Sequence, residues 1–370
     1  MITFVAILTQ KMEEMKKMVW MALACCISCL ALAQEAGVKI QWVERIPMGD
    51  GTMVYRYATG EKKHLEGECR LVVNEREYII ADFKDGMPEG KWETYRYNTL
   101  YERRNYKKGK IDGNVTTYGS DGKTVIAEST ATSGKRDGRY VTYYANGTLE
   151  REQEYKDGKE HCYLRTYDQD GNVKWDCYYE DGKMHGQQTQ LFFSNQENYV
   201  KISNYEHGTL VGDYTELYEK GGIKEKGQYD KKGKKTGLWQ SKTKQGQNIE
   251  DTEYKNGERD GTRKTYFDDN TLKKVETYKN GELDGLTTEY NYRTRKLESE
   301  TTYVAGRRQG PFKEYQEDGK TLKAEGENKN GNVIKRKSYY PNGKLRRVEE
   351  GEGFDFKVVE EYDETGKKTK

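Results

Sequence analysis

Histidine and cysteine are the side chains of this chain best suited to metal or nucleophilic chemistry, and they are scattered. The four histidines lie far apart along the chain, at His64, His161, His185 and His207. None stands in the H-E-x-x-H or H-x-x-E-H spacing of a helical zinc site. His161 and Cys162 are adjacent, but neither a C-x-x-C nor an H-x-x-x-H accompanies them, and zinc prefers four ligands. The sequence therefore predicts neither a metal site nor a cofactor.

Paired carboxylates are the next candidates for chemistry. Glu150 and Glu152 stand at alternate positions and could in principle hydrolyse a polymer of the cell envelope. Alternating acids on a strand are, however, typical of a solvated face. The many Asp-Gly pairs lack the alternating acids and the closing Glu of a calcium loop, and no G-x-S-x-G or nucleotide-binding glycine loop occurs. We therefore expect a protein without catalytic residues, which is not an enzyme.

The glycines show what the chain is built from. A first glycine recurs at intervals of 23 to 26 residues, and a second glycine usually follows it four residues later. Cys162 and Lys335 replace the second glycine in two units. Periods of this size indicate tandem repeats. The first glycines are Gly86, Gly109, Gly134, Gly158, Gly182, Gly208, Gly233, Gly257, Gly281, Gly306 and Gly331.

Each repeat is predicted to form a β-hairpin. Runs such as Leu286 to Tyr290 are rich in Thr and Tyr, which favour strands, and pairs such as Asn146-Gly147 favour tight turns. The G-x-x-x-G element is predicted to be the return turn of the hairpin. We therefore expect an all-β, elongated repeat array of antiparallel hairpins, an open β-meander or solenoid, at residues 57–370, with degenerate first and last units. Residues 34–56 are predicted to be a lead-in strand region.

Aromatic residues recur at two positions of the repeat. Five residues after the second-glycine position, most units carry tyrosine, which we interpret as a structural ladder between hairpins: Tyr95, Tyr118, Tyr143, Tyr167, Tyr266, Tyr290, Tyr315 and Tyr340. A more variable row lies two residues after that position. Its large aromatic members are our candidate binding surface: Trp92, Tyr140, Tyr214, Trp239 and Phe312. The two positions differ in parity, so either both sheet faces carry aromatics or a bulge intervenes.

The N-terminus reads as a secretory signal peptide over residues 1–33. Lys16 and Lys17 precede an apolar run that ends in Ala31-Leu32-Ala33, the pattern of a cleavage site. Met15 is an alternative start. Lipidation stays open, although Cys29 has Cys26 where the lipid signal needs Leu. We therefore expect export to the periplasm, the outer envelope or the exterior.

Three cysteines remain after cleavage, which is too few for a disulfide scaffold. Cys162 and Cys177 lie on two arms of one predicted hairpin and face each other only if Asp168 pairs with Gly171. The sequence leaves this disulfide open.

The charge of the chain argues against nucleic acid as a partner. Lys and Arg number 64 and Asp and Glu number 62, so the net charge is +2, and no basic block dominates. With 34% charged residues the chain is very polar, yet its 31 tyrosines recur at fixed spacing, which disordered segments do not show.

Units such as Tyr254 to Gly261 (YKNGERDG) and Tyr278 to Gly285 (YKNGELDG) resemble MORN repeats, in the variant form found as tandem arrays in bacterial secreted proteins. The resemblance implies an array of β-hairpins that binds proteins or membrane lipids. We therefore expect an exported scaffold for protein–protein interaction at the cell envelope, with an unknown protein as its partner. The alternatives are binding of a glycan or lipid headgroup along an aromatic groove, and an antitoxin or immunity role beside an effector.

Overall fold

The computed structural model describes residues 37–193, 198–351 and 355–370. The predicted signal peptide lies outside these residues. The chain divides into two compact units, the first ending at Val173 and the second running over Lys174–Lys370, and each is described by itself. Within the described ranges, no helix is both long and apolar enough to cross a membrane.

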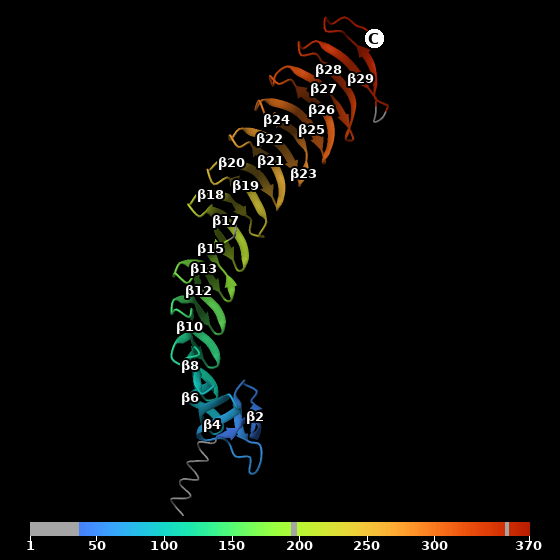
Figure 1. Ribbon diagram of the computed structural model, residues 1–370. Coiled ribbons are helices and arrows are strands. Elements are labelled where there is room, and N and C mark those ends of the chain that lie inside the picture. The colour runs from blue at the N-terminus through green and yellow to red at the C-terminus, as the bar shows by residue number, and fades with distance from the viewer. Residues whose placement is uncertain (1–36, 194–197, 352–354) are drawn as a thin grey trace, which may run out of the picture. The chain divides into compact units, whose positions relative to one another are not determined.

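The first unit consists of strands and one short 3-10 helix (Figure 1). Its elements are β1 (Val38–Lys39), η1 (Ile40–Trp42), β2 (Val43–Pro47), β3 (Met53–Tyr57), β4 (Gly67–Asn74), β5 (Glu77–Lys84), β6 (Met87–Arg96), β7 (Thr99–Lys107), β8 (Lys110–Tyr118), β9 (Val125–Thr132), β10 (Lys135–Tyr143), β11 (Leu149–Lys156) and β12 (Lys159–Tyr167).

Strands joined by turns make up nearly all of the described part of the second unit. Its strands are β13 (Val173–Glu180), which begins at the last residue of the first unit, β14 (Lys183–Met184), β15 (Gly186–Phe192), β16 (Tyr199–Glu206), β17 (Thr209–Tyr218), β18 (Ile223–Tyr229), β19 (Lys235–Lys242), β20 (Asn248–Lys255), β21 (Glu258–Tyr266), β22 (Leu272–Lys279), β23 (Glu282–Leu283), β24 (Gly285–Tyr290), β25 (Leu297–Val304), β26 (Arg307–Tyr315), β27 (Leu322–Lys329), β28 (Asn332–Tyr339), β29 (Leu345–Glu350) and β30 (Lys357–Glu361).

Successive strands pair antiparallel within each unit, so hairpins follow one another as an open meander (Figure 1). The predicted all-β class and hairpin array are confirmed. The predicted lead-in region forms the short β1, which pairs parallel with β4, and the separate β2–β3 hairpin. Val43 of that hairpin joins Leu65, Leu71 and Phe83 in the hydrophobic core at the start of the first unit.

The prediction for the G-x-x-x-G element is half right. The return turn consists of the first glycine and its predecessor, as at Asp85 (φ 53°) and Gly86 (φ 76°), both in the left-handed region. Such a two-residue turn matches the twist of the flanking strands. The second glycine, Gly90 (φ 84°), lies inside β6, near a break in the β5–β6 register between Ala81 and Phe83. It is a bulge residue, because its conformation lets the strand continue past the break.

Backbone hydrogen bonds join each hairpin to the next at the edge formed by these glycine turns. The first glycine of a repeat donates its N–H to a backbone carbonyl of the preceding repeat. This carbonyl belongs to the residue two positions before the second glycine of that preceding repeat. Gly109 donates to Pro88 over 2.9 Å, and Gly281 donates to Arg259 over 2.9 Å. The same bond recurs at Gly134, Gly158, Gly208, Gly257, Gly306 and Gly331. Each of these eight turns therefore has a fixed position against its neighbour.

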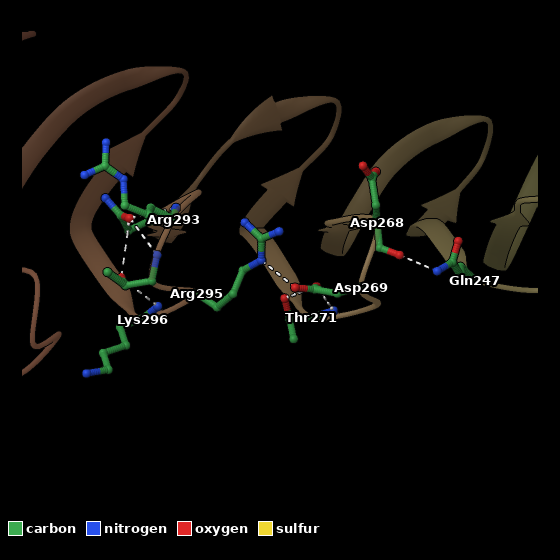
Figure 2. Close-up of polar contacts among 9 residues, drawn as sticks. Gln247, Asp268, Asp269, Thr271, Arg293, Arg295 and Lys296 are labelled. Atoms are coloured by element: carbon green, nitrogen blue, oxygen red, sulfur yellow. Dashed lines mark hydrogen bonds and ion pairs between the residues drawn. The ribbon is translucent and has the colours of Figure 1, made fainter.

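The opposite edge is joined by side chains. Figure 2 shows three successive turns on which Gln247 reaches the backbone carbonyl of Asp268, and Arg295 reaches the carboxylate of Asp269. The Arg295 Nε to Asp269 Oδ2 distance is 2.6 Å. The Arg295 guanidinium also lies 4.1 Å from the centre of the Phe267 ring. Both edges of the second unit are thus held by contacts that reach only to the adjacent hairpin.

Candidate functional site

Most of the predicted binding surface is buried. Trp92, Tyr214, Trp239 and Phe312 are between 3% and 8% exposed, and Tyr140 is half-buried. We call these five residues the inner row. We expected these residues to face a ligand, but the rings of Trp92, Tyr214 and Trp239 are buried against other aromatic rings. Whether the inner row takes part in binding is untested. If it does, the four buried rings are not the atoms that contact the partner.

Three members of the inner row, Trp92, Tyr140 and Trp239, pack against the aromatic residue three positions before the next first glycine. The ring centres of Trp92 and Tyr106 are 5.2 Å apart, and those of Trp239 and Tyr254 are 6.3 Å apart. Tyr214 packs against Tyr229, which stands four positions before Gly233, with ring centres 5.6 Å apart. Each of these repeats therefore contributes a ring to an aromatic core that neighbouring repeats share. Edge and tilted contacts of this kind add about 0.5–1.5 kcal/mol beyond burial.

Small residues on adjacent strands make room for the inner row. Gly227 pairs with Tyr214, and a Cβ atom on Gly227 would overlap the ring of Trp239. Gly326 pairs with Phe312, and a Cβ atom there would lie 2.6 Å from Phe312 Cε1. The backbone of these two glycines is not in the left-handed region, so they are required for close approach.

Seven members of the predicted tyrosine ladder lie on the opposite face and are half-buried: Tyr95, Tyr118, Tyr143, Tyr167, Tyr266, Tyr290 and Tyr315. The prediction for Tyr340 is wrong, because this residue lies in the turn after β28, and Tyr339, whose hydroxyl donates to Glu325, takes the ladder position there. Both faces therefore carry aromatics, which was one of the two outcomes that parity allowed.

Hydroxyl groups, more than ring contacts, link this ladder. The hydroxyl of Tyr266 donates to Asp251 Oδ2 over 2.7 Å, and that of Tyr315 donates to Glu300 Oε2 over 2.8 Å. Partial burial and these carboxylates raise the pKa of both hydroxyls to about 12. The acid stands 15 residues before the tyrosine, a spacing that is visible in the sequence and that we did not use.

Glu150 and Glu152, the paired carboxylates considered for hydrolysis, both have polar partners. Glu152 accepts a hydrogen bond from the Tyr167 hydroxyl over 2.5 Å and is 3.2 Å from an Arg139 nitrogen. Glu150 accepts from the Thr142 hydroxyl over 3.0 Å. Contacts of this kind stabilise the pairing of neighbouring strands.

A gap in the aromatic core of the first unit forms a hollow of about 540 Å³. Val115 occupies the position of the inner row there, and Ala131 occupies the position that holds Tyr106 and Tyr155 in the neighbouring units. Ser129, the strand partner of Val115, is also small. The hollow therefore exists because two consecutive aromatic positions carry small side chains.

Basic groups surround this hollow. Arg104, Lys135 and Arg136 line it against one acid, Glu102. An Arg104 terminal nitrogen lies 2.6 Å from Glu102, while the buried Arg104 Nε has no hydrogen-bond partner among the described residues. Burial opposes the charge of Arg104, but hydrogen bonds with Tyr106 and Glu102 raise its pKa above the ordinary value. The Arg136 guanidinium lies 4.7 Å from the Tyr140 ring centre and 5.0 Å from that of Tyr155.

The chemistry of the hollow favours an anionic group. Three cations face one carboxylate, and a guanidinium binds a carboxylate in a bidentate geometry. The half-buried Tyr140 is the one member of the predicted binding surface that contributes here, because it holds Arg136 at the rim. We call this site the Arg104 hollow.

The structure also brings together three residues that do not form a recognisable motif in the sequence. The ligand atoms of Glu180, His185 and His207 all lie within 4.8 Å of one another. Because they come from turns of successive hairpins, no short motif contains them. Cys162 lies in the first unit and Cys177 in the second, so the disulfide that the sequence left open stays open.

Comparison with solved structures gives distant likenesses. The chain is similar to a crystal structure of TcdB2-TccC3, with 11% identity, a TM-score of 0.16, and 86% of this chain and 24% of that one covered. It is also similar to a Photorhabdus luminescens Tc holotoxin pore, with 12% identity, a TM-score of 0.15, and 86% and 20% covered. This chain thus spans a quarter or less of either chain's length. No curated protein matches the chain.

Comparison with protein families gives a direct match. Residues 136–157, 259–280 and 329–350 match the MORN repeat variant. Two of these segments lie in the second unit and one in the first, and the same glycine turn, bulge and hairpin recur between them. The chain is a MORN-repeat protein.

Proposed function

We propose that this chain is an exported, non-enzymatic scaffold that binds a partner protein at the cell envelope. MORN repeats suggest a scaffold for protein or membrane interaction. The signal-peptide pattern at Lys16, Lys17 and Ala31 to Ala33 supports export. Mass analysis of the protein from the envelope fraction tests this part, since the mature chain should begin at Gln34.

The Arg104 hollow is the observation that carries the proposal. In the neighbouring repeats Trp92 pairs with Tyr106 and Tyr140 pairs with Tyr155, whereas here a cavity of about 540 Å³ opens between cationic side chains. We propose that an acidic side chain of the partner enters it and pairs with Arg104, whose buried Nε lacks a partner among the described residues. Arginine is one of the residue types enriched among those that dominate the binding energy of protein interfaces.

The test fills the hollow with the residue that neighbouring units carry. Ala131→Tyr places at this position the side chain found at Tyr106 and Tyr155, so the fold is expected to persist. The mature chain and this variant are used to recover partners from envelope extracts, with Leu238→Ala as the matched control, because Leu238 is 50% exposed in the other unit. We expect Ala131→Tyr to lose a partner that Leu238→Ala retains.

Two alternatives are separate arms of the same experiment. Vesicle sedimentation and a glycan array test lipid headgroups and glycans, which the cationic hollow could also attract. Recovery of a toxin as the partner would assign an immunity role. A partner captured equally by Ala131→Tyr and by the unaltered chain would refute the hollow as the site.

A further inference from the structure

Two histidines and one carboxylate converge at one edge of the second unit. His185 Nδ1 lies 3.5 Å from Glu180 Oε2, and the ring centres of His185 and His207 are 5.1 Å apart. Glu180 and His185 are half-buried and His207 is exposed. Nδ1 of His185 is itself buried, and nothing in the described part of the chain makes a hydrogen bond with it. The cluster therefore contains an available ligand nitrogen pointing at a carboxylate.

Backbone hydrogen bonds fix the two turns that carry these residues. His185 donates its N–H to the Tyr178 carbonyl over 2.8 Å, across the β13–β14 turn. Gly208, next to His207, donates to the Met184 carbonyl over 2.8 Å. Backbone hydrogen bonds of the kind that join the other hairpins thus fix the Cα positions of His185 and His207.

Other units of the array show what these two positions normally do. The residue before the second glycine accepts a hydrogen bond from the N–H of the residue before the next first glycine. Asp260 accepts from Asn280 over 3.2 Å, and Gln309 accepts from Asn330 over 2.9 Å. His185 and His207 stand in these two positions, where an imidazole replaces the oxygen acceptor. His207 also adopts φ 48°, in the left-handed region where Asn280 and Asn330 lie in their own repeats. Hairpin geometry therefore does not explain why both positions are histidine.

We propose that Glu180, His185 and His207 bind one divalent transition-metal ion of the zinc type between two neighbouring hairpins. Imidazole nitrogen and carboxylate oxygen are the donors such ions prefer, at about 2.0–2.2 Å. In a tetrahedral site these bonds place the ligand atoms about 3.4 Å apart. Atoms that lie within 4.8 Å reach this arrangement by side-chain rotation, for which the exposed His207 and the long Glu180 have room.

Three protein ligands leave a fourth coordination position open. The site lies at the edge of the unit, where His207 is exposed, so water or a donor from another molecule can occupy that position. This role is separate from the Arg104 hollow, which lies in the other unit.

Titration of the untagged chain with Co²⁺ and then with Zn²⁺ tests the proposal. Tetrahedral Co²⁺ gives visible absorption bands, which Zn²⁺ should remove on displacing it. We expect saturable binding of one ion per chain. The double variant His185→Gln with His207→Asn installs the side chains found at Gln309 and Asn330, which form the ordinary hydrogen bond. It should keep the fold, as judged by circular dichroism, and weaken binding by at least about 100-fold, since loss of outer-shell partners alone costs 10–100-fold.

His161→Ala is the matched control, because it removes a histidine outside the cluster. It should bind the metal as the unaltered chain does. Absence of saturable binding below about 1 mM, a concentration that corresponds to only about 4 kcal/mol of affinity, would overturn the proposal. Equal binding by the double variant would also overturn it.

Discussion

Replacing Trp239 with alanine gives a direct test of the assignment of the inner row to the core. The ring is 3% exposed and contacts Tyr214 and Tyr229, with ring centres 5.4 Å and 5.1 Å away. Its Nε1–H donates to the Gln228 carbonyl over 3.2 Å, and the Lys235 ammonium lies 3.6 Å from the ring centre. Removing a buried Trp side chain costs about 3–5 kcal/mol, and the lost hydrogen bond is within that range.

The expected loss is local, because a hairpin in a repeat array contacts only its neighbours. Hydrogen exchange measured by mass spectrometry is therefore a better assay than a single unfolding curve. A loss of about 4 kcal/mol corresponds to nearly a 1,000-fold faster exchange, since each 1.4 kcal/mol is tenfold. We expect this change in β17 to β20 and little change in β29 and β30.

Leu238→Ala is the control for this measurement. Leu238 is the preceding residue of the same strand, points to the other face and is 50% exposed. Its truncation should change exchange by less than about threefold, because exposed positions contribute within about 0.5 kcal/mol. If Trp239→Ala accelerates exchange in β17 to β20 no more than Leu238→Ala does, the ring is not a core residue and our reading of the inner row is refuted.

Two further predictions follow from the same contacts. Because the pKa values of Tyr167, Tyr266 and Tyr315 are raised to about 12, the stability that their neutral hydroxyls contribute is fully present below pH 10, the ordinary tyrosine pKa, and is lost as the pH rises towards 12. In an alkaline absorbance titration, the triple Tyr→Phe variant should lack part of the late transition; ionisation of every tyrosine near pH 10 would contradict this. Gly326→Ala should destabilise β26 to β28 by about 1–3 kcal/mol, because its Cβ would overlap the Lys335 carbonyl and crowd Phe312, as seen by hydrogen exchange. Gly49→Ala, with no atom within 4 Å of the added Cβ, should have no effect, and equal effects of the two changes would argue against close packing at Gly326.

Local chemistry made most of the fold predictable. A turn glycine followed by strand-forming residues determines a hairpin from neighbouring positions alone, so strands such as β22 (Leu272–Lys279) were expected from Lys273 to Tyr278. The second glycine was misread for the same reason. A bulge depends on the register with the adjacent strand, which sits about a dozen residues away in sequence, and Gly90 looks the same in a turn and in a bulge.

The faces of the sheet were harder to assign, because burial depends on pairs. Trp239 is buried since Gly227 leaves space beneath it, and Phe312 since Gly326 does the same. Because the residue type varies along the inner row, we expected these side chains to be exposed. In a packed core, however, a large residue on one strand is compensated by a small residue on the neighbouring strand, so the residue type can vary at buried positions too. Two sites likewise depend on contacts between neighbouring strands or turns. The Arg104 hollow follows from the pairing of Val115 with Ser129, and the cluster of Glu180, His185 and His207 follows from the placement of adjacent turns.

The glycine-turn bond has a consequence for how such a gene changes. Most first glycines contact a carbonyl of the preceding repeat through one recurring backbone geometry, as Gly281 does with Arg259 and Gly306 with Leu283. Backbone groups are the same in every unit, so the junction does not depend on which side chains flank it. An in-frame duplication or deletion of a whole repeat thus creates a junction of the kind already present. Recombination can lengthen or shorten the array without a compensating mutation, and the positions that differ between copies are then free to diverge.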